Sequence, residues 1–176
     1  AMRQNFSLAP AVLADERNLD ATPGATNFLA KAERVDRAAL VEAGHVFQHA
    51  VAELARAAAA INRWPDGNVV LVTDLGKVRI ASVSDDSYSD KALLILEPGG
   101  RNTYQGMAGV ANALRDQRLS AIIDLGGDDT YRTDGLLGAG AALFGVSVVV
   151  DAHGNDAWRA PYVGQGAGLT PCVFNL

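Results

Sequence analysis

The sequence predicts a mainly β protein with an N-terminal helical segment, in which the β part is a parallel β-solenoid of about four coils. The first observation is a change of texture after Asn68, from alanine- and leucine-rich sequence to short β-branched runs separated by glycines and acids. The second is a motif that recurs every 27 residues, within the range typical of stacked repeat architectures. The third is that this unit is too short for a helical crossover between strands, which disfavours the runner-up, an α/β sandwich.

Residues 1–68 are predicted to form a helical cap on the repeats of residues 69–176, the two together making one cooperative unit. Apolar residues recur at helical spacing through residues 26–63, between the turn sequences TPG and WPDGN. This pattern predicts one long helix, or two helices with a break near Gly44. A shorter helix is predicted over Pro10–Arg17.

Three segments share the form apolar-apolar-acid-x-x-Gly-x-(Asp/Asn)-x-aromatic. They are LLILEPGGRNTYQ from Leu93, SAIIDLGGDDTYR from Ser120 and SVVVDAHGNDAWR from Ser147. Their equivalent positions are Glu97, Asp124 and Asp151; Gly100, Gly127 and Gly154; Asn102, Asp129 and Asp156; and Tyr104, Tyr131 and Trp158. A degenerate earlier copy is predicted from VTDLG at 72–76 and SDDSY at 84–88, and a helical stretch over Met107–Asp116.

Stacking gives each class of position a structural role. The apolar runs become parallel strands, the glycines form corners, and the aromatic residues stack in a column. The acids form two columns with about 4.8 Å between neighbours. Residues 121–160 contain six Asp and two Arg, a net charge of −4, so these columns need compensation from arginines, from backbone N–H groups or from a cation.

The cores GDDTY and GNDAW resemble the second half of the calcium-binding RTX repeat, although RTX units are nine residues long and these are 27 apart. The longer pattern, from IIDLGGDDTYR to GQGAG, resembles repeats of large bacterial proteins that are themselves predicted β-solenoids. This second resemblance covers residues 69–176 and implies a fold. The first implies bound Ca²⁺.

The acidic columns have three interpretations. Asp and Asn at turns can simply bond local N–H groups and hold the corners. Hard oxygen ligands can instead bind Ca²⁺, and the candidate ligands are Asp124, Asp128, Asp129, Asp151, Asn155 and Asp156. In the third interpretation Asp128, Asp129 and Asp156 act as acid and base in a polysaccharide-acting hydrolase or lyase.

Other signals are weaker. Glu42, His45, His49 and Glu53 share one predicted helix face, a geometry that can bind a metal but more often is a polar surface. The glycine-rich runs lack the lysine of a phosphate-binding loop, so nucleotide binding is rejected. A net charge of −5 argues against nucleic acid. No apolar stretch is long enough to span a membrane.

The favoured function is that of a structural or binding module that bound Ca²⁺ stabilises, in an extracellular or envelope location. The 27-residue step places the next acid at position 178, and VFNL at 173–176 matches the strand that would precede it. An open last coil exposes unpaired strand groups. We therefore expect association with another copy or a further chain through Val173–Leu176, and carbohydrate is a possible ligand of the acidic edge.

Overall fold

The computed structural model describes residues 30, 32–135, 137–160 and 166–169. The chain divides into two compact units, Ala1–Ala38 and Ala39–Leu176, and all strands among the described residues lie in the second. The helix predicted over Pro10–Arg17 and the strand predicted at 173–176 lie outside the described residues.

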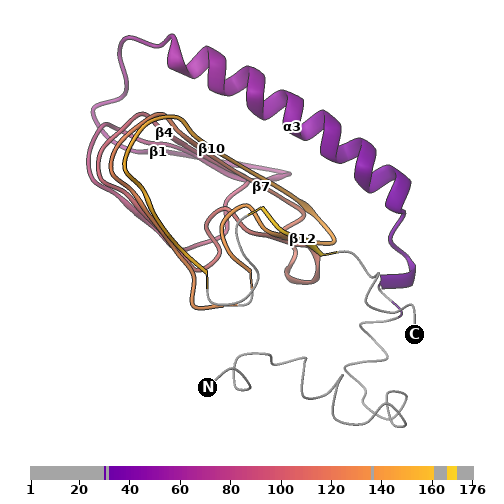
Figure 1. The fold of residues 1–176 in the computed structure, drawn as a ribbon. Coiled ribbons are helices and arrows are strands. Elements are labelled where there is room, and N and C mark those ends of the chain that lie inside the picture. The colour runs from indigo at the N-terminus through magenta and orange to yellow at the C-terminus, as the bar shows by residue number, and fades with distance from the viewer. Residues whose placement is uncertain (1–29, 31, 136, 161–165, 170–176) are drawn as a thin grey trace. The chain divides into compact units, whose positions relative to one another are not determined.

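The second unit is mainly β, with one helix before three sheets (Figure 1). The helix is α3 (Arg37–Ala59), and it continues through Gly44 without a break. The first sheet contains, in spatial order, β1 (Val69–Thr73), β2 (Gly76–Ile80), β4 (Leu94–Glu97), β7 (Leu119–Asp124) and β10 (Val146–Asp151). The second contains β11 (Ala157–Arg159), β8 (Thr130–Arg132), β5 (Thr103–Gln105) and β3 (Ser87–Tyr88). The third contains β12 (Gly168–Leu169), β9 (Ala142–Leu143) and β6 (Ala111–Asn112).

The chain visits the three sheets in rotation, so strands of successive repeats lie side by side and parallel. In the first sheet Leu94 pairs with Ala121 and Ala121 with Val148. In the second sheet β5, β8 and β11 pair in the same 27-residue step. The predicted register of the three repeats is therefore confirmed.

The earlier copy follows a different path from the one predicted. SDDSY does occupy the place of a repeat, because Tyr88 pairs with Tyr104. The segment VTDLG does not, because Val72 and Thr73 belong to β1, which forms an antiparallel hairpin with β2. The strand beside β4 is β2, with Val78 opposite Leu94, so the first step is 16 residues rather than 27.

Both faces of the central strands of the first sheet, β4 and β7, are covered. Ile95, Ile122 and Val149 point to the interior that the sheets share. The alternate residues, such as Leu96 and Ile123, pack with Val51 of α3 on the other face. A strand buried on both faces has a continuous run of apolar residues in its sequence. This explains the runs LLIL, AII and VVV in the segments of β4, β7 and β10. Within the predicted cap of residues 1–68, α3 therefore covers a face of this sheet.

The helical stretch predicted over Met107–Asp116 is also wrong. The segment forms β6 and then a single 3₁₀ turn, Ala113–Arg115. Gly109 has φ +66°, and a Cβ there would lie 2.6 Å from Ile122 Cδ1, so this backbone passes against the core in a conformation that no α-helix permits. Among the described residues, no helix has the length and apolarity needed to cross a membrane.

Candidate metal centre in a buried row of carboxyl groups

Glycine corners bring successive repeats into direct backbone contact. Gly127 has φ +141°, and a Cβ on it would lie 1.7 Å from the carbonyl oxygen of Gly100. Gly154 has φ +151° and makes the same approach to the carbonyl of Gly127. Only glycine combines this φ with this closeness, as the sequence predicted for these positions.

Next to the corners, a ladder of side chain to backbone hydrogen bonds links the repeats. The N–H of Asp86 donates to Asn102 Oδ1 at 3.0 Å, that of Asn102 to Asp129 Oδ1 at 2.5 Å, and that of Asp129 to Asp156 Oδ1 at 2.9 Å. Asn102 and Asp129 are almost fully buried. These side chains do accept hydrogen bonds from backbone N–H groups at the corners, as predicted, but the N–H belongs to the neighbouring repeat rather than to the local turn.

A second, exposed ladder runs beside the first in the opposite direction. The N–H of Arg101 donates to Asp85 Oδ1 at 2.7 Å, and the N–H of Asn155 donates to Asp128 Oδ1 at 3.1 Å. Here the acceptor belongs to the earlier repeat. Asp128 and Asn155 therefore hold the outer turn and lie in solvent.

The other acidic column lies inside the stack. Glu97 pairs in register with Asp124, and Asp124 with Asp151. Glu97 and Asp124 have no exposed surface. Asp124 is well satisfied, because the Tyr104 hydroxyl donates to its Oδ2 at 2.6 Å and the Gly126 N–H to its Oδ1 at 3.0 Å. Both oxygens of Glu97 have no hydrogen-bond partner among the described residues.

Sequence reasoning missed that the aromatic column faces this acidic column. Tyr88, Tyr104 and Tyr131 stack with ring centroids 5.4 and 4.7 Å apart, and Trp158 continues the column at 3.7 Å. Each tyrosine lies near the acid of the following repeat, although only Tyr104 makes a well-formed hydrogen bond. The sequence does contain a pattern that could have predicted this contact, since the tyrosine and the acid of the next repeat are 20 residues apart in both later repeats.

Burial raises the pKa values of these carboxyl groups. Loss of hydration, with the nearby charges of Asp86 and Asp124, raises the pKa of Glu97 to about 9. Burial also raises the pKa of Asp129 to about 6, against the opposing hydrogen bond from Asn102. The pKa values of Asp124 and Asp151 are raised as well, mainly by burial. At neutral pH Glu97 therefore keeps its proton.

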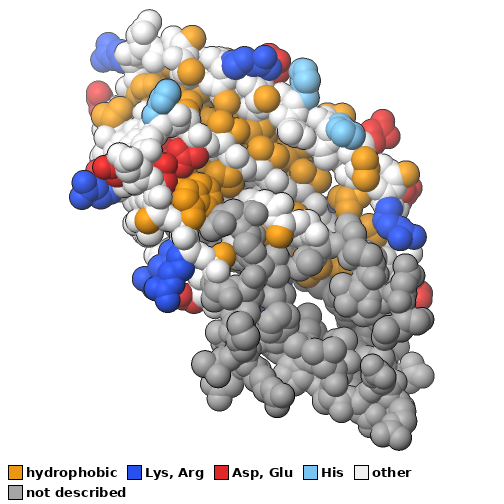
Figure 2. All heavy atoms as spheres, viewed as in Figure 1, with side chains coloured by type: hydrophobic (Ala, Val, Ile, Leu, Met, Phe, Trp, Pro, Cys, Tyr) orange, Lys and Arg blue, Asp and Glu red, His pale blue; other side chains and the backbone are white. Residues whose placement is uncertain are grey.

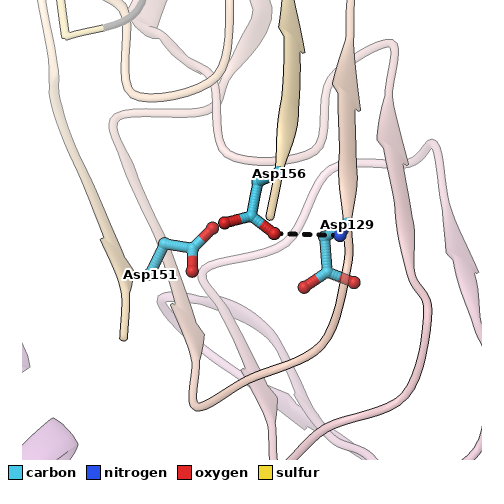
Figure 3. A group of neighbouring side chains, drawn as sticks. All are labelled: Asp129, Asp151 and Asp156. Carbon is cyan, nitrogen blue, oxygen red and sulfur yellow. Dashed lines mark hydrogen bonds between the residues drawn. The ribbon is translucent and has the colours of Figure 1, made fainter. Parts of the chain in front are cut away.

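Two carboxyl groups of this row lie close to a third, that of Asp156. Asp129, Asp151 and Asp156 each offer an oxygen, and the three oxygens lie within 4.8 Å of one another (Figure 3). Asp129 is 1% exposed, and its Oδ2 has no partner, nor has Oδ2 of Asp151. This group could hold a metal ion, and it combines members of both predicted columns.

Of the remaining predicted ligands, two lie apart from this group, and Asp124 lies beside Asp129 with both of its oxygens already accepting hydrogen bonds. Asp128 and Asn155 belong to the exposed ladder, and Asp124 is sealed between Tyr104 and Gly126. The catalytic interpretation needed Asp128, Asp129 and Asp156 on one accessible edge. Asp128 points to solvent while Asp129 is buried, so the described geometry does not present them together to a substrate.

A hollow of about 750 Å³ lies beside β10, with His45 and Gln48 of α3 and with Val148, Asp151 and Trp158 among its lining residues. Figure 2 shows hydrophobic side chains gathered on this face of the described part. The predicted helix face of Glu42, His45, His49 and Glu53 is exposed, and Glu53 pairs with His49 at 3.9 Å and with Arg56. Within the described residues, these four do not form a metal-ligating group.

Comparison with protein-family models, with curated proteins and with solved structures found no match to this chain. The site must therefore be interpreted from its own geometry.

Proposed function

We propose that this chain is a structural or binding module, built as a parallel β-solenoid that Ca²⁺ stabilises at Asp129, Asp151 and Asp156. The solenoid interpretation is supported by the rotation of the chain through three sheets and by the 27-residue pairing step. Extensive repeat-to-repeat hydrogen bonding favours a rigid scaffold over a mobile catalytic cleft.

The observation that carries the calcium proposal is the buried, unpartnered oxygen of Asp129 beside two further carboxylates. A buried charge without a partner is costly, and a bound cation removes that cost for all three groups together. Asp156 also keeps Asp129 in place, since its Oδ1 accepts the Asp129 N–H. The ladder thus positions the ligands before any ion arrives.

Ligand chemistry and spacing favour Ca²⁺. All donors are carboxylate oxygens, which exclude a preference for soft metals. Two oxygens bound to one Ca²⁺ at 2.3–2.6 Å are at most about 5 Å apart, whereas Mg²⁺ at 2.0–2.1 Å allows only about 4.2 Å. The three oxygens lie within 4.8 Å of one another, so one Ca²⁺ can reach all of them.

Thermal unfolding in EDTA, Ca²⁺ and Mg²⁺ tests this function. A ligand that binds only the folded state raises the melting temperature. We expect Ca²⁺ to raise it for the wild type and for Asp128→Asn, whose side chain lies on the exposed ladder, but not for Asp151→Asn. An unchanged melting temperature in millimolar Ca²⁺, or an equal rise in Asp151→Asn, would show that the acids do not bind calcium.

Association belongs to the same proposal. Among the described residues, β10, β11 and β12 form the edges of their sheets at one end of the stack. A further strand of the same repeat, from another copy or another chain, could continue all three sheets from these edges. Val173–Leu176, predicted to take part, lie outside the described residues. An extracellular or envelope location, where calcium is abundant, fits this role.

A further inference from the structure

The strand β1 is an exposed, apolar sheet edge. Its residues are Val-Val-Leu-Val-Thr, and all five are classed as exposed. Val70 is 47% exposed, Leu71 49% and Val72 84%. Because the side chains of a strand alternate between the two faces of the sheet, apolar groups are exposed on both sides of this edge.

Among the described residues β1 and β10 are the two long sheet edges, and the other edge strands have two or three residues. β10 is half-buried and ends at Asp151, whereas β1 is exposed along its whole length. The edge strands β3, β6 and β12 have two residues each. Short strands, charges and prolines are the usual means of preventing edge pairing. Residues Val69–Thr73 contain neither a charge nor a proline. Alternate residues of β1 bond β2 through their N–H and C=O groups. The N–H and C=O groups of the residues between them point away from the sheet.

We propose that β1 pairs antiparallel with β1 of a second copy of this chain, about a twofold axis at Leu71. An occupant of this edge must supply a strand and uncharged apolar side chains on both faces. The edge itself meets both requirements, so the interface is isologous and closes as a dimer. Nothing in this inference depends on calcium or on the carboxyl row.

The register of this dimer is self-complementary. An axis at Leu71 places Val70 opposite Val72 and Val69 opposite Thr73. Beyond the strand, it places Asn68 opposite Asp74, an amide facing a carboxylate, and no like charges meet in this register. Apolar cross-strand pairs of this kind stabilise an antiparallel ladder, and the first sheet would continue from one copy into the other.

Sedimentation velocity on the full chain over a range of concentrations tests the dimer. We expect the wild type to move from 18.4 kDa towards twice that mass, and Val72→Lys to weaken dimerisation at least tenfold. Val46→Lys is the matched control, because Val46 is 66% exposed but lies on α3. Thermal melts establish that both variants fold.

Oxidative crosslinking tests the register, in a Cys172→Ser background. Leu71→Cys should form a disulfide-linked dimer readily, because the two copies of this position face each other across the axis. Val69→Cys should not, because its two copies would lie about 13 Å apart at about 3.4 Å per residue, beyond the reach of a disulfide.

Three results would overturn the proposal. The first is a wild type that stays monomeric at the highest soluble concentration, which would mean that β1 is free or is covered within its own chain. The second is assembly beyond the dimer that Val72→Lys abolishes, which would indicate head-to-tail pairing. The third is crosslinking of Val69→Cys as fast as that of Leu71→Cys.

Discussion

Replacing Asp129 by Asn separates the two roles of this residue. Its Oδ1 accepts the N–H of Asn102, and an amide oxygen can do the same, as Asn102 itself does for Asp86 one repeat earlier. The substitution removes only the ionisable group. It therefore tests whether a carboxylate at this buried position destabilises the fold in the absence of metal.

The size of the effect follows from the pKa of Asp129. Burial raises that pKa to about 6 from a usual value of 3.8. A raised pKa in the folded state favours stability at low pH, and this contribution is lost as the pH rises through 6. The full difference of about two pKa units corresponds to about 3 kcal/mol. Because Asp129 interacts with Asp124 and Asp156, we expect about half of this, or about 1–2 kcal/mol.

Urea unfolding in EDTA measures this free energy of unfolding. At pH 8 we expect Asp129→Asn to be more stable than the wild type by about 1–2 kcal/mol, because the wild type must ionise a buried carboxyl group. Near pH 4, where that group keeps its proton, the gain should vanish. A variant less stable than the wild type by the same amount at both pH values would refute the reasoning and leave Asp129 with a hydrogen-bonding role alone.

Two further predictions test the corners and the aromatic column. Gly127→Ala should lose several kcal/mol of unfolding free energy and fail to fold, because its Cβ would overlap a carbonyl oxygen of the preceding repeat. Gly67→Ala has no atom within 4 Å of the new Cβ, so its stability should stay within about 1 kcal/mol of that of the wild type. Circular dichroism melts compare the two variants. Tyr104→Phe should cost about 1–3 kcal/mol by leaving Asp124 Oδ2 without its donor. Tyr131→Phe should cost less in the same urea assay, because the buried Tyr131 hydroxyl has no hydrogen-bond partner among the described residues, and equal losses would contradict this.

Most of the architecture could be predicted because the repeat encodes it locally. The equal spacing of Glu97, Asp124 and Asp151 predicted their pairing in register, and the structure confirms it. The predicted stacking of Tyr104 on Tyr131 is also confirmed. When repeats stack, residues at equivalent positions of successive repeats are neighbours in space. The repeat period therefore predicts long-range contacts that usually cannot be predicted from sequence.

The predictions failed where the period breaks. VTDLG has the composition of a repeat, but a two-residue turn after Thr73 reverses the chain into a hairpin. Helical spacing over Met107–Asp116 was overridden by Gly109, whose positive φ is needed where the backbone passes Ile122. In both places a local backbone conformation outweighed the pattern of side-chain types.

The 27-residue spacing was enough to predict the parallel pairing, its register and the residue types at the corners, because each repeat has the same pattern of apolar, acidic, glycine and aromatic positions. Only the tertiary structure decided which acids converge. Asp151 and Asp156 belong to one repeat and Asp129 to the repeat before, and their oxygens lie close together because the Asp129 N–H bonds Asp156 across the two repeats. Burial was decided there too, since the neighbouring repeats exclude water from groups that the sequence shows only as charged. The physical reason is that the pKa and ion affinity of a carboxylate depend on its distance from other charges and from water, and these distances exist only once the chain has folded.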